Sequence, residues 1–113
     1  MSFWIITVPG LPANGMAIFP FILIKNPSSK QDPILINHEK IHLRQQLELL
    51  ILPFYFFYFF NYLINFLRYR NHYQAYFNIL FEREAFHADK DLGYLKKRKF
   101  MAWIGMINKP PMV

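Results

Sequence analysis

Residues 35–60 read LINHEKIHLRQQLELLILPFYFFYFF and join a polar, histidine-containing segment directly to an aromatic one. His38, Glu39 and His42 form an H-E-x-x-H motif. On a helix, the two histidines lie one turn apart on the same face, so both imidazoles can bind one zinc ion. Glu39 then borders the open side of that ion, where it can take a proton from metal-bound water. The motif therefore predicts a zinc-dependent hydrolase.

The composition is unusually apolar for a chain of 113 residues. Hydrophobic residues make up 54% of the chain, aromatic residues 19% and charged residues 18%. So small a domain cannot bury so many rings, so we expect the surplus to face lipid or a partner. The basic residues, which give a net charge of +6, flank apolar segments and favour anionic lipid headgroups. The aromatic residues are not interleaved with Arg and Lys, which argues against nucleic-acid binding.

The residue pattern predicts one mainly α-helical domain, residues 1–113, that begins with a short β-hairpin. Residues 1–30 hold this hairpin and its edge strand. The two strands would be FWIITV (residues 3–8) and MAIFPFILIK (residues 16–25), joined by the turn-forming segment PGLPANG, although two interfacial segments fit the same runs. Pro20 confines the second strand to a sheet edge, because proline has no N–H group to donate.

Two helical segments follow the predicted hairpin. The first, residues 33–67, should begin at the Asp-Pro pair of residues 32 and 33, which suits an N-cap and a first helical position. It would carry the H-E-x-x-H motif and then a membrane segment, with Pro53 kinking or ending the helix. The second, residues 72–99, would supply a third metal ligand. Residues 100–113 are interpreted as an interfacial tail.

A catalytic zinc ion takes three protein ligands and one water molecule, so the motif needs one more side chain. The second helix offers Glu82 and Glu84 in the stretch FEREAF. Glu82 shares a narrow, mixed polar face with the small residue Ala85, which would let the two helices approach closely. Glu84 would point about 160° away around the helix axis, nearer to solvent.

HEKIH, followed by a helix that bears EREA, resembles the gluzincin metallopeptidases and their minimal members, the minigluzincins. The resemblance covers residues 37–90 and implies a minimal zincin-like membrane protein. It implies His38, His42 and Glu82 as ligands of one zinc ion per chain and Glu39 as the general base. The implied activity is that of a zinc-dependent endopeptidase, embedded in or on the membrane, that hydrolyses peptide bonds by Glu-assisted attack of zinc-bound water.

The resemblance also suggests supporting residues. The family places an aspartate where this chain has Phe86, so Asp89 or Asn78 would hydrogen-bond a metal ligand instead. Gln45 and Gln46, a turn beyond the motif, can bond a ligand or the second helix, or make polar contacts within a bundle. A Tyr, His or Arg across the cleft usually stabilises the oxyanion of the tetrahedral intermediate. The sequence does not rank the four candidates, Tyr94, His87, Tyr76 and His72.

Family members bind an extended peptide along an edge strand through backbone hydrogen bonds. We expect this role for Ala17, Ile18, Phe19, Phe21, Ile22, Leu23 and Ile24. The expected partners are therefore a peptide or protein substrate and the lipid membrane. The sequence does not specify the oligomeric state.

The apolar segment, residues 49–67, matches the length of a membrane-spanning helix, which is about 20 residues. If the two long helices pack antiparallel, His42 faces Glu82 only when the chain reverses near residue 62 or when Pro53 bends the first helix. Either arrangement makes the segment a helical hairpin that dips into the membrane. Basic residues near both ends favour a cytoplasmic site in an integral membrane protein.

Two other functions fit the same residues. Glu39-x-x-His42 and Glu84-x-x-His87 have the spacing of di-iron carboxylate sites, although the remaining ligands of such a site are missing. The chain could instead be a non-catalytic or latent membrane binding or sensor protein that carries a zinc site. In the latent form, the tail segment GMINKPPMV, residues 105–113, would lie over the cleft.

Overall fold

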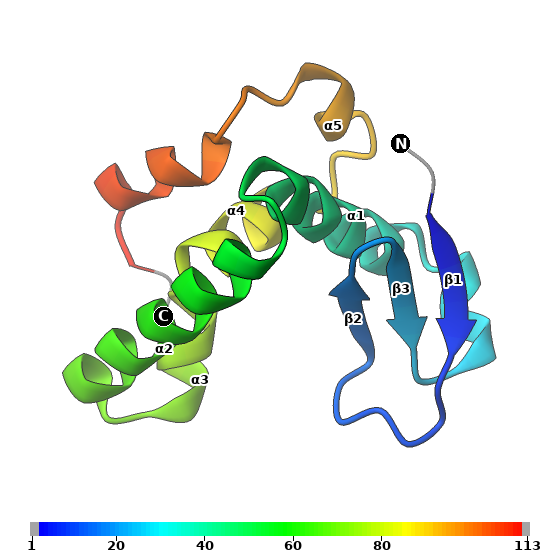
Figure 1. Cartoon of the computed structure of the whole chain (residues 1–113), viewed down its shortest axis with the longest axis horizontal. Coiled ribbons are helices and arrows are strands. Elements are labelled where there is room, and N and C mark those ends of the chain that lie inside the picture. The colour runs from blue at the N-terminus through cyan, green and yellow to red at the C-terminus, as the bar shows by residue number, and fades with distance from the viewer. Residues whose placement is uncertain (1–2, 112–113) are drawn as a thin grey trace.

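The chain is organised around one helix, α1, against which a small sheet and a second helix, α4, both pack in the computed structural model (Figure 1). The structure describes residues 3–111, so residues 1–2 and 112–113 of the predicted hairpin and tail lie outside it. The elements in chain order are β1 (Trp4–Thr7), β2 (Gly15–Ile18), β3 (Phe21–Ile24), the 3-10 helix η1 (Pro27–Gln31), α1 (Pro33–Glu48), α2 (Leu52–Tyr69), α3 (His72–Phe77), α4 (Leu80–Ala88), α5 (Tyr94–Lys97) and the 3-10 helix η2 (Ala102–Asn108). The prediction of a mainly helical fold with a small N-terminal sheet is confirmed.

The three strands form one sheet of order β1-β3-β2, in which β3 is central. β2 and β3 pair antiparallel as a hairpin with its turn at Phe19 and Pro20, and β1 pairs parallel with β3 on the other side. The predicted hairpin between residues 3–8 and residues 16–25 is therefore wrong. The second run folds back on itself, because Pro20 has a fixed φ angle and no N–H group for a strand ladder.

α1 begins where the sequence predicts. The Asp32 side chain accepts hydrogen bonds from the backbone N–H groups of Ile34 and Leu35, at 3.1 and 3.2 Å. These bonds satisfy two of the N–H groups that the first turn of a helix leaves without partners. Pro33 occupies the first turn, where its missing N–H group costs nothing.

The apolar segment does not continue α1 in a straight line. Leu50 and Ile51 have positive φ angles of 59° and 73°, and α1 and α2 are bent by 112° across this break. The prediction that the helix ends or bends near Pro53 is confirmed, whereas a reversal at residues 61–65 is wrong, because α2 continues to Tyr69. Within residues 3–111 no single helix is long and apolar enough to cross a membrane, and α1 and α2 meet that criterion only as a bent pair.

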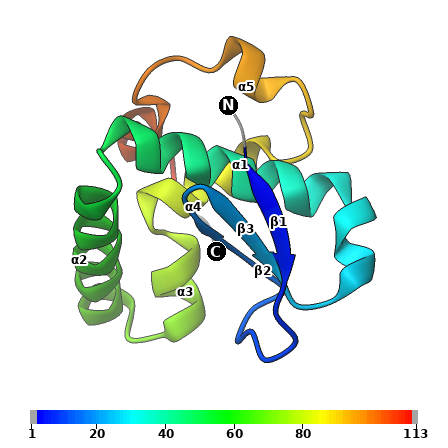
Figure 2. The same ribbon diagram turned by 45° about the vertical axis from the view of Figure 1, so that its right-hand side comes forward.

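The predicted second helix, residues 72–99, is interrupted twice, giving α3, α4 and α5. At the first break, the backbone N–H group of Leu80 donates to Asn61 Oδ1 of α2 at 2.8 Å. The Asn65 side chain of α2 donates to the Ala75 carbonyl at 3.1 Å. The two asparagines of the apolar helix therefore hold α3 and α4 beside it (Figure 2).

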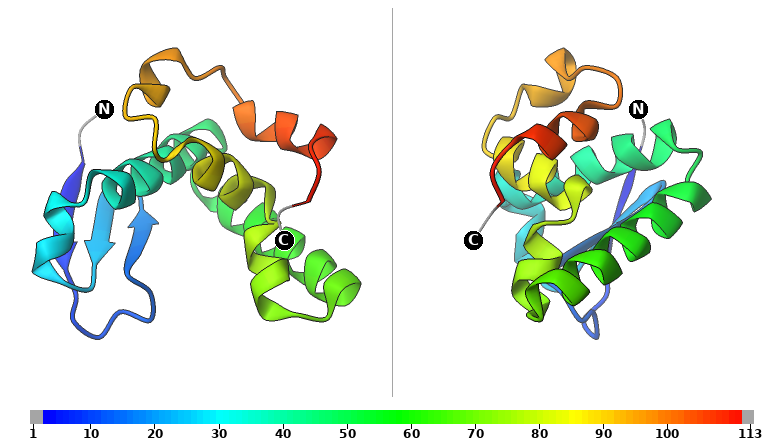
Figure 3. Two further views of the ribbon diagram at one scale, coloured as in Figure 1. Left: turned by 180° about the vertical axis from the view of Figure 1, so that it is seen from behind. Right: turned by 90° about the vertical axis from the view of Figure 1, so that its left-hand side faces the viewer.

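α4 runs along α1 in the opposite direction, as the sequence predicts (Figure 3). Asn37, near the start of α1, donates to the Asp89 carbonyl at 2.8 Å, just beyond the end of α4. Gln45, near the end of α1, donates to the Phe81 carbonyl at 3.0 Å, near the start of α4. These amide contacts fix the register in which the two helices meet.

Gln46 joins α1 to the sheet. Its Oε1 atom accepts from the Phe19 backbone N–H group and its Nε2 atom donates to the Ala17 carbonyl, both at 2.7 Å. The Gln46 side chain is buried, and the two backbone groups that it bonds are half-buried beside the cleft. Ile22 of β3 packs with Leu43 of α1 in the core beneath this contact.

We predict that Gln46→Ala lowers the free energy of unfolding by about 2 kcal/mol, because two half-buried backbone groups lose their hydrogen bonds. Urea unfolding followed by circular dichroism measures this change. The control is Gln31→Ala, since Gln31 is exposed, and it should change the midpoint little. Equal midpoints for the two variants would show that Gln46 does not hold the sheet on α1.

Candidate metal centre

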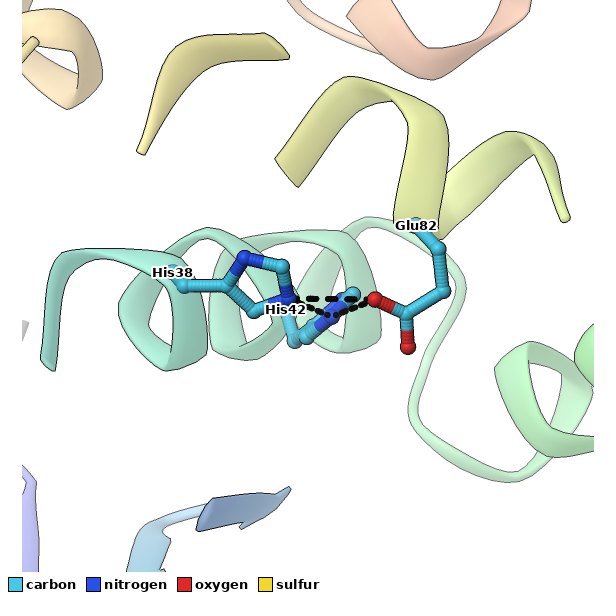
Figure 4. A group of neighbouring side chains, drawn as sticks. All are labelled: His38, His42 and Glu82. Carbon is cyan, nitrogen blue, oxygen red and sulfur yellow. Dashed lines mark hydrogen bonds and ion pairs between the residues drawn. The ribbon is translucent and has the colours of Figure 1, made fainter. Parts of the chain in front are cut away.

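Three ligand-type side chains converge where α1 passes α4 (Figure 4). His38 and His42 come from successive turns of α1, and Glu82 comes from the first turn of α4. Glu82 Oε1 lies 3.0 Å from Nε2 of each histidine, and the two Nε2 atoms are 3.2 Å apart. All three residues are buried. Within residues 3–111, this group could hold a metal ion.

The donor spacing fits a tetrahedral ion. Zn–N and Zn–O bonds of about 2.0–2.1 Å place neighbouring ligand atoms about 3.3 Å apart in a tetrahedron. The separations of 3.0 and 3.2 Å are close to this value, so binding requires only small side-chain movements. Two histidines, one glutamate and one open position make up a known donor set of catalytic zinc sites.

A hydrogen-bond acceptor holds the outer nitrogen of each histidine. Asp89 Oδ2 lies 3.0 Å from Nδ1 of His38, and Gln45 Oε1 lies 2.8 Å from Nδ1 of His42. In the neutral imidazole these acceptors keep the proton on Nδ1, so that Nε2 presents its lone pair to the shared site. Asp89 thus contacts His38, as expected for a residue that supports a ligand, and Gln45 is the matching acceptor for the second histidine.

Gln45 is itself held in one orientation. Its Nε2 atom donates to the Phe81 carbonyl at 3.0 Å and to Glu84 Oε1 at 2.9 Å, which turns Oε1 toward His42. Glu84 is 0% exposed, so the prediction that it points toward solvent is wrong. The side of α4 that the isolated helix would expose is covered in the fold by α1 and by the segment that contains Arg98.

Arg98 joins Glu84 to Glu48 in a buried ionic network. Its Nε atom donates to Glu84 at 2.5 Å, and its Nη1 atom donates to Glu48 at 2.6 Å. The Tyr94 hydroxyl donates to Glu84 at 2.6 Å. Burial raises the pKa of Glu84, but the hydrogen bonds from Arg98, Tyr94 and Gln45 outweigh it and lower that pKa below its usual range. Glu84 therefore stays ionised and anchors the amide behind the second histidine.

The pKa values of the two carboxyl groups of the site, Glu82 and Glu39, shift in opposite directions. Burial lowers the pKa of His42, but the Glu82 carboxylate outweighs burial and raises it to about 9. Burial raises the pKa of Glu82, and the two histidines outweigh it and lower that pKa well below its usual range. For Glu39, burial prevails over both histidines and the pKa rises. Glu82 is thus the permanent anion, and Glu39 is the carboxyl group that takes up a proton more readily.

The metal group and Glu39 open into one cleft of about 560 Å³ between β2, α1 and α2. His42, Glu82 and Glu39 all line it. Phe54 of α2 lines it too, and its ring packs edge-to-face against His42 with centroids 6.4 Å apart. At Gly15 of β2, an added Cβ would lie 3.2 Å from Glu39 Oε2 and from Leu35 Cδ1, so a larger residue would require these side chains to shift by a few tenths of an ångström. The glycine is a site residue that the sequence patterns did not reveal.

β2 borders the cleft, with its other side paired to β3. Ala17 and Ile18, which were predicted to bind substrate, lie in β2 and line the cleft. The other predicted positions are wrong, because a central strand or a turn has no free edge: Phe19 lies in the turn, and Phe21, Ile22, Leu23 and Ile24 form β3, which pairs on both sides. The edge beside the metal group is therefore Gly15–Ile18.

Of the four predicted oxyanion stabilisers, Tyr76 lines the cleft. The other three do not line it: Tyr94 is bonded to Glu84, His72 to the Tyr62 hydroxyl, and His87 is exposed. Tyr58 of α2 was not predicted, yet it lines the cleft and donates to Glu82 Oε2 at 2.5 Å. Tyr58 lies one helical turn after Phe54, which also lines the cleft, and this spacing is the sequence signal that could have identified Tyr58.

The structure also shows where Asn78 and Phe86 lie relative to the two histidines. Asn78 lies between α3 and α4, where its side chain donates to the Gln74 carbonyl at 2.8 Å. Phe86 packs its ring against His38 with centroids 4.5 Å apart. The ring thus fixes the histidine by contact, and Asp89 supplies the acceptor from the next turn.

The structure also bears on the two alternative functions, a di-iron carboxylate site and a latent protein whose tail covers the cleft. His87 is exposed and Glu84 is bonded to Arg98, so the two E-x-x-H pairs do not converge on one site. The tail up to residue 111 does not line the cleft, and the carbonyls of Lys109 and Pro110 accept from Arg83 on α4.

Comparisons of the chain with protein-family models, curated proteins and solved structures give no match. The function proposed below therefore rests on the site itself.

We predict that Asp89→Ala weakens zinc binding by about 10- to 100-fold, because His38 loses the acceptor that orients its ring. Asp89→Asn keeps a side-chain oxygen and should weaken binding less. Competition with a chromophoric chelator measures both affinities. Asp91→Ala is the matched control, since that carboxylate pairs with Lys97 at the surface. Equal affinities for Asp89→Ala and Asp91→Ala would refute the orienting role.

Glu84→Ala should destabilise the fold by about 3–5 kcal/mol, because it leaves Arg98 buried with half of its carboxylate partners. Thermal or urea unfolding of the metal-free chain measures the loss. Lys97→Ala removes an exposed ion pair and should cost less than about 1 kcal/mol. A Glu84→Ala variant as stable as Lys97→Ala would mean that the network contributes nothing to folding.

Proposed function

We propose that this chain is a zinc-dependent endopeptidase. The observation that carries the proposal is the group formed by His38 Nε2, His42 Nε2 and Glu82 Oε1, spaced for one tetrahedral ion and opening with Glu39 into the same cleft. Structural zinc sites have four protein ligands, whereas catalytic sites have three and an open position. The second arrangement matches these residues.

The ligands are arranged to keep the open position on the cleft side. Asp89 and Gln45 hold the histidines from behind, and Tyr58 donates to Glu82 Oε2, which leaves Oε1 for the ion. When bound, a zinc ion lowers the pKa of water and polarises a carbonyl group. The donor set of nitrogen and carboxylate oxygen, with no cysteine in the chain, suits this ion.

Glu39 is the proton acceptor and donor in the proposed reaction. It follows His38 directly, so the same helical turn that positions the ligands aims this carboxylate into the cleft. Glu39 takes the proton of the attacking water and passes it to the leaving amine nitrogen. Tyr76 and Tyr58 both line the cleft, and the hydroxyl groups of both interact with Glu82, so either tyrosine can turn its hydroxyl donor toward the developing oxyanion.

The cleft suits an extended peptide with apolar side chains. The free edge of β2 can pair with a substrate backbone, as in other proteins that add a strand to a sheet. Gln46 takes the Ala17 carbonyl and fixes this edge against α1, at a constant distance from Glu39. Met16 and Ile18 from β2 and Tyr55 from α2 form apolar walls on either side.

We expect Glu39→Gln to keep about one zinc ion per chain and to lower peptide hydrolysis by at least about 10³-fold, because the proton acceptor is lost. His38→Ala should lose both zinc and hydrolysis. Elemental analysis and a fluorogenic peptide library read out the two properties. His87→Ala, an exposed histidine of α4, is the control that should keep both.

Three results would contradict the proposal. Loss of zinc in Glu39→Gln would make Glu39 a ligand rather than the base. Stoichiometric zinc with no hydrolysis of any peptide by the wild type would favour a non-catalytic zinc-binding protein. Two iron ions per site would point to carboxylate di-iron chemistry.

A further inference from the structure

α2 presents an apolar face to the outside of the molecule, where none of the described elements covers it (Figure 2). Between 55% and 66% of the surface of each residue in this set is exposed: Phe56, Phe57, Phe59, Phe60, Ile64 and Leu67. We call these six residues the outer face of α2. Contiguous apolar surfaces of this kind mark sites of contact with protein or membrane.

The polar residues of α2 lie on the opposite side. Asn61 and Asn65 point toward α3 and α4, where they bond to the Leu80 N–H group and the Ala75 carbonyl. A surface helix in water shows the reverse order, with apolar residues facing the core and polar residues facing out. α2 therefore has the orientation of a helix whose surroundings are less polar than its own protein interior.

The width of the exposed surface distinguishes lipid from a second copy of the chain. The buried and half-buried positions of α2, residues 54, 58, 61, 62, 65 and 69, all fall within an arc of about 100°. The exposed arc is thus about 260° wide at 100° per residue. A partner helix covers a much narrower stripe. Lipid chains surround a helix to any width, so the width favours lipid.

We propose that the outer face of α2 is seated in a lipid bilayer, with the helix lying along one membrane surface. Arg68 is the one charged residue of α2, and Arg70 follows its C-terminal end. Both are exposed where anionic headgroups can bind them. Tyr69 and Tyr73 flank the same end, as aromatic residues do at membrane interfaces.

This seating brings the cleft to the membrane. Phe54 and Tyr55 line the cleft and belong to the same helix as the outer face, so a peptide in the cleft would lie beside the lipid surface. Membrane-associated polypeptides are then the substrate class. That consequence rests on the proposed peptidase function, whereas the lipid contact of α2 does not.

Flotation of the full chain with vesicles of phosphatidylcholine and phosphatidylglycerol tests the proposal without any assay of hydrolysis. The wild type should float with the vesicles. One triple variant, Phe56→Ser with Phe60→Ser and Ile64→Ser, should lose at least about tenfold in partitioning, because three exposed apolar side chains leave the lipid. Circular dichroism checks that the variant keeps the helix content of the wild type.

The matched control replaces three exposed apolar residues outside α2, Leu92, Phe100 and Ile107, with serine. It should float as the wild type does. Equal flotation of the two triple variants would overturn the proposal. So would a wild type that ignores vesicles and forms a dimer that the α2 variant breaks, since the face would then belong to a second copy.

Quenching by brominated lipids gives a second readout that does not depend on the serine variants. Phe60→Trp should be quenched strongly in vesicles and Leu92→Trp weakly, with Trp4 and Trp103 contributing equally to both. Equal quenching would place α2 outside the lipid and overturn the proposal.

Discussion

The antiparallel contact between α1 and α4 is the interaction on which the rest of the structure depends. It brings Glu82 within 3.0 Å of both histidines, and the same register places Asp89 and Gln45 behind the two rings. A shift of one turn would move these partners by about 5.4 Å and break every contact of the site. Folding and metal-site assembly are therefore one event, and the amides of Asn37 and Gln45 hold the register from both ends.

The sharp bend between α1 and α2 turns this helix pair into a site with a cleft. Leu50 and Ile51 adopt positive φ angles, which cost about 1–3 kcal/mol each for such residues. The inner face of α2 offsets that cost, because Phe54 packs against Phe81 of α4 with ring centroids 4.5 Å apart. A straight continuation of α1 would leave the histidines without the aromatic wall. The bent segment thus supplies both the helix of the histidines and a wall of the cleft.

Polar side chains are numerous in the interior of the described part of the chain, and all but the Trp103 Nε1 atom have hydrogen-bond partners. Arg98 pairs with both Glu48 and Glu84, and the amide of Gln45 connects that network to His42. Buried networks of this type are costly when one member is missing and rigid when all are present. Rigidity matters here because the histidine rings must meet an ion within a few tenths of an ångström. The C-terminal segment therefore supports the site without touching it.

The sequence alone determined the parts of this protein that depend on local geometry. Helical periodicity placed His38, Glu39 and His42 on one turn, and the Asp-Pro pair at residues 32 and 33 marked the start of α1. The small, mixed polar face of the second helix, together with the resemblance of the motifs, pointed to Glu82, and helical spacing placed Asp89 on that same face. Apart from the resemblance, these results need only the pitch of a helix.

Only the tertiary structure decided what meets across elements. It split residues 16–25 into β2 and β3, interrupted the second helix at the contact with Asn61, and buried Glu84 against Arg98. It also placed Tyr58 against Glu82 and placed three of the four predicted oxyanion stabilisers outside the cleft. The physical reason is that such contacts depend on bend angles and side-chain partners distant in sequence, which residue spacing within one helix does not encode.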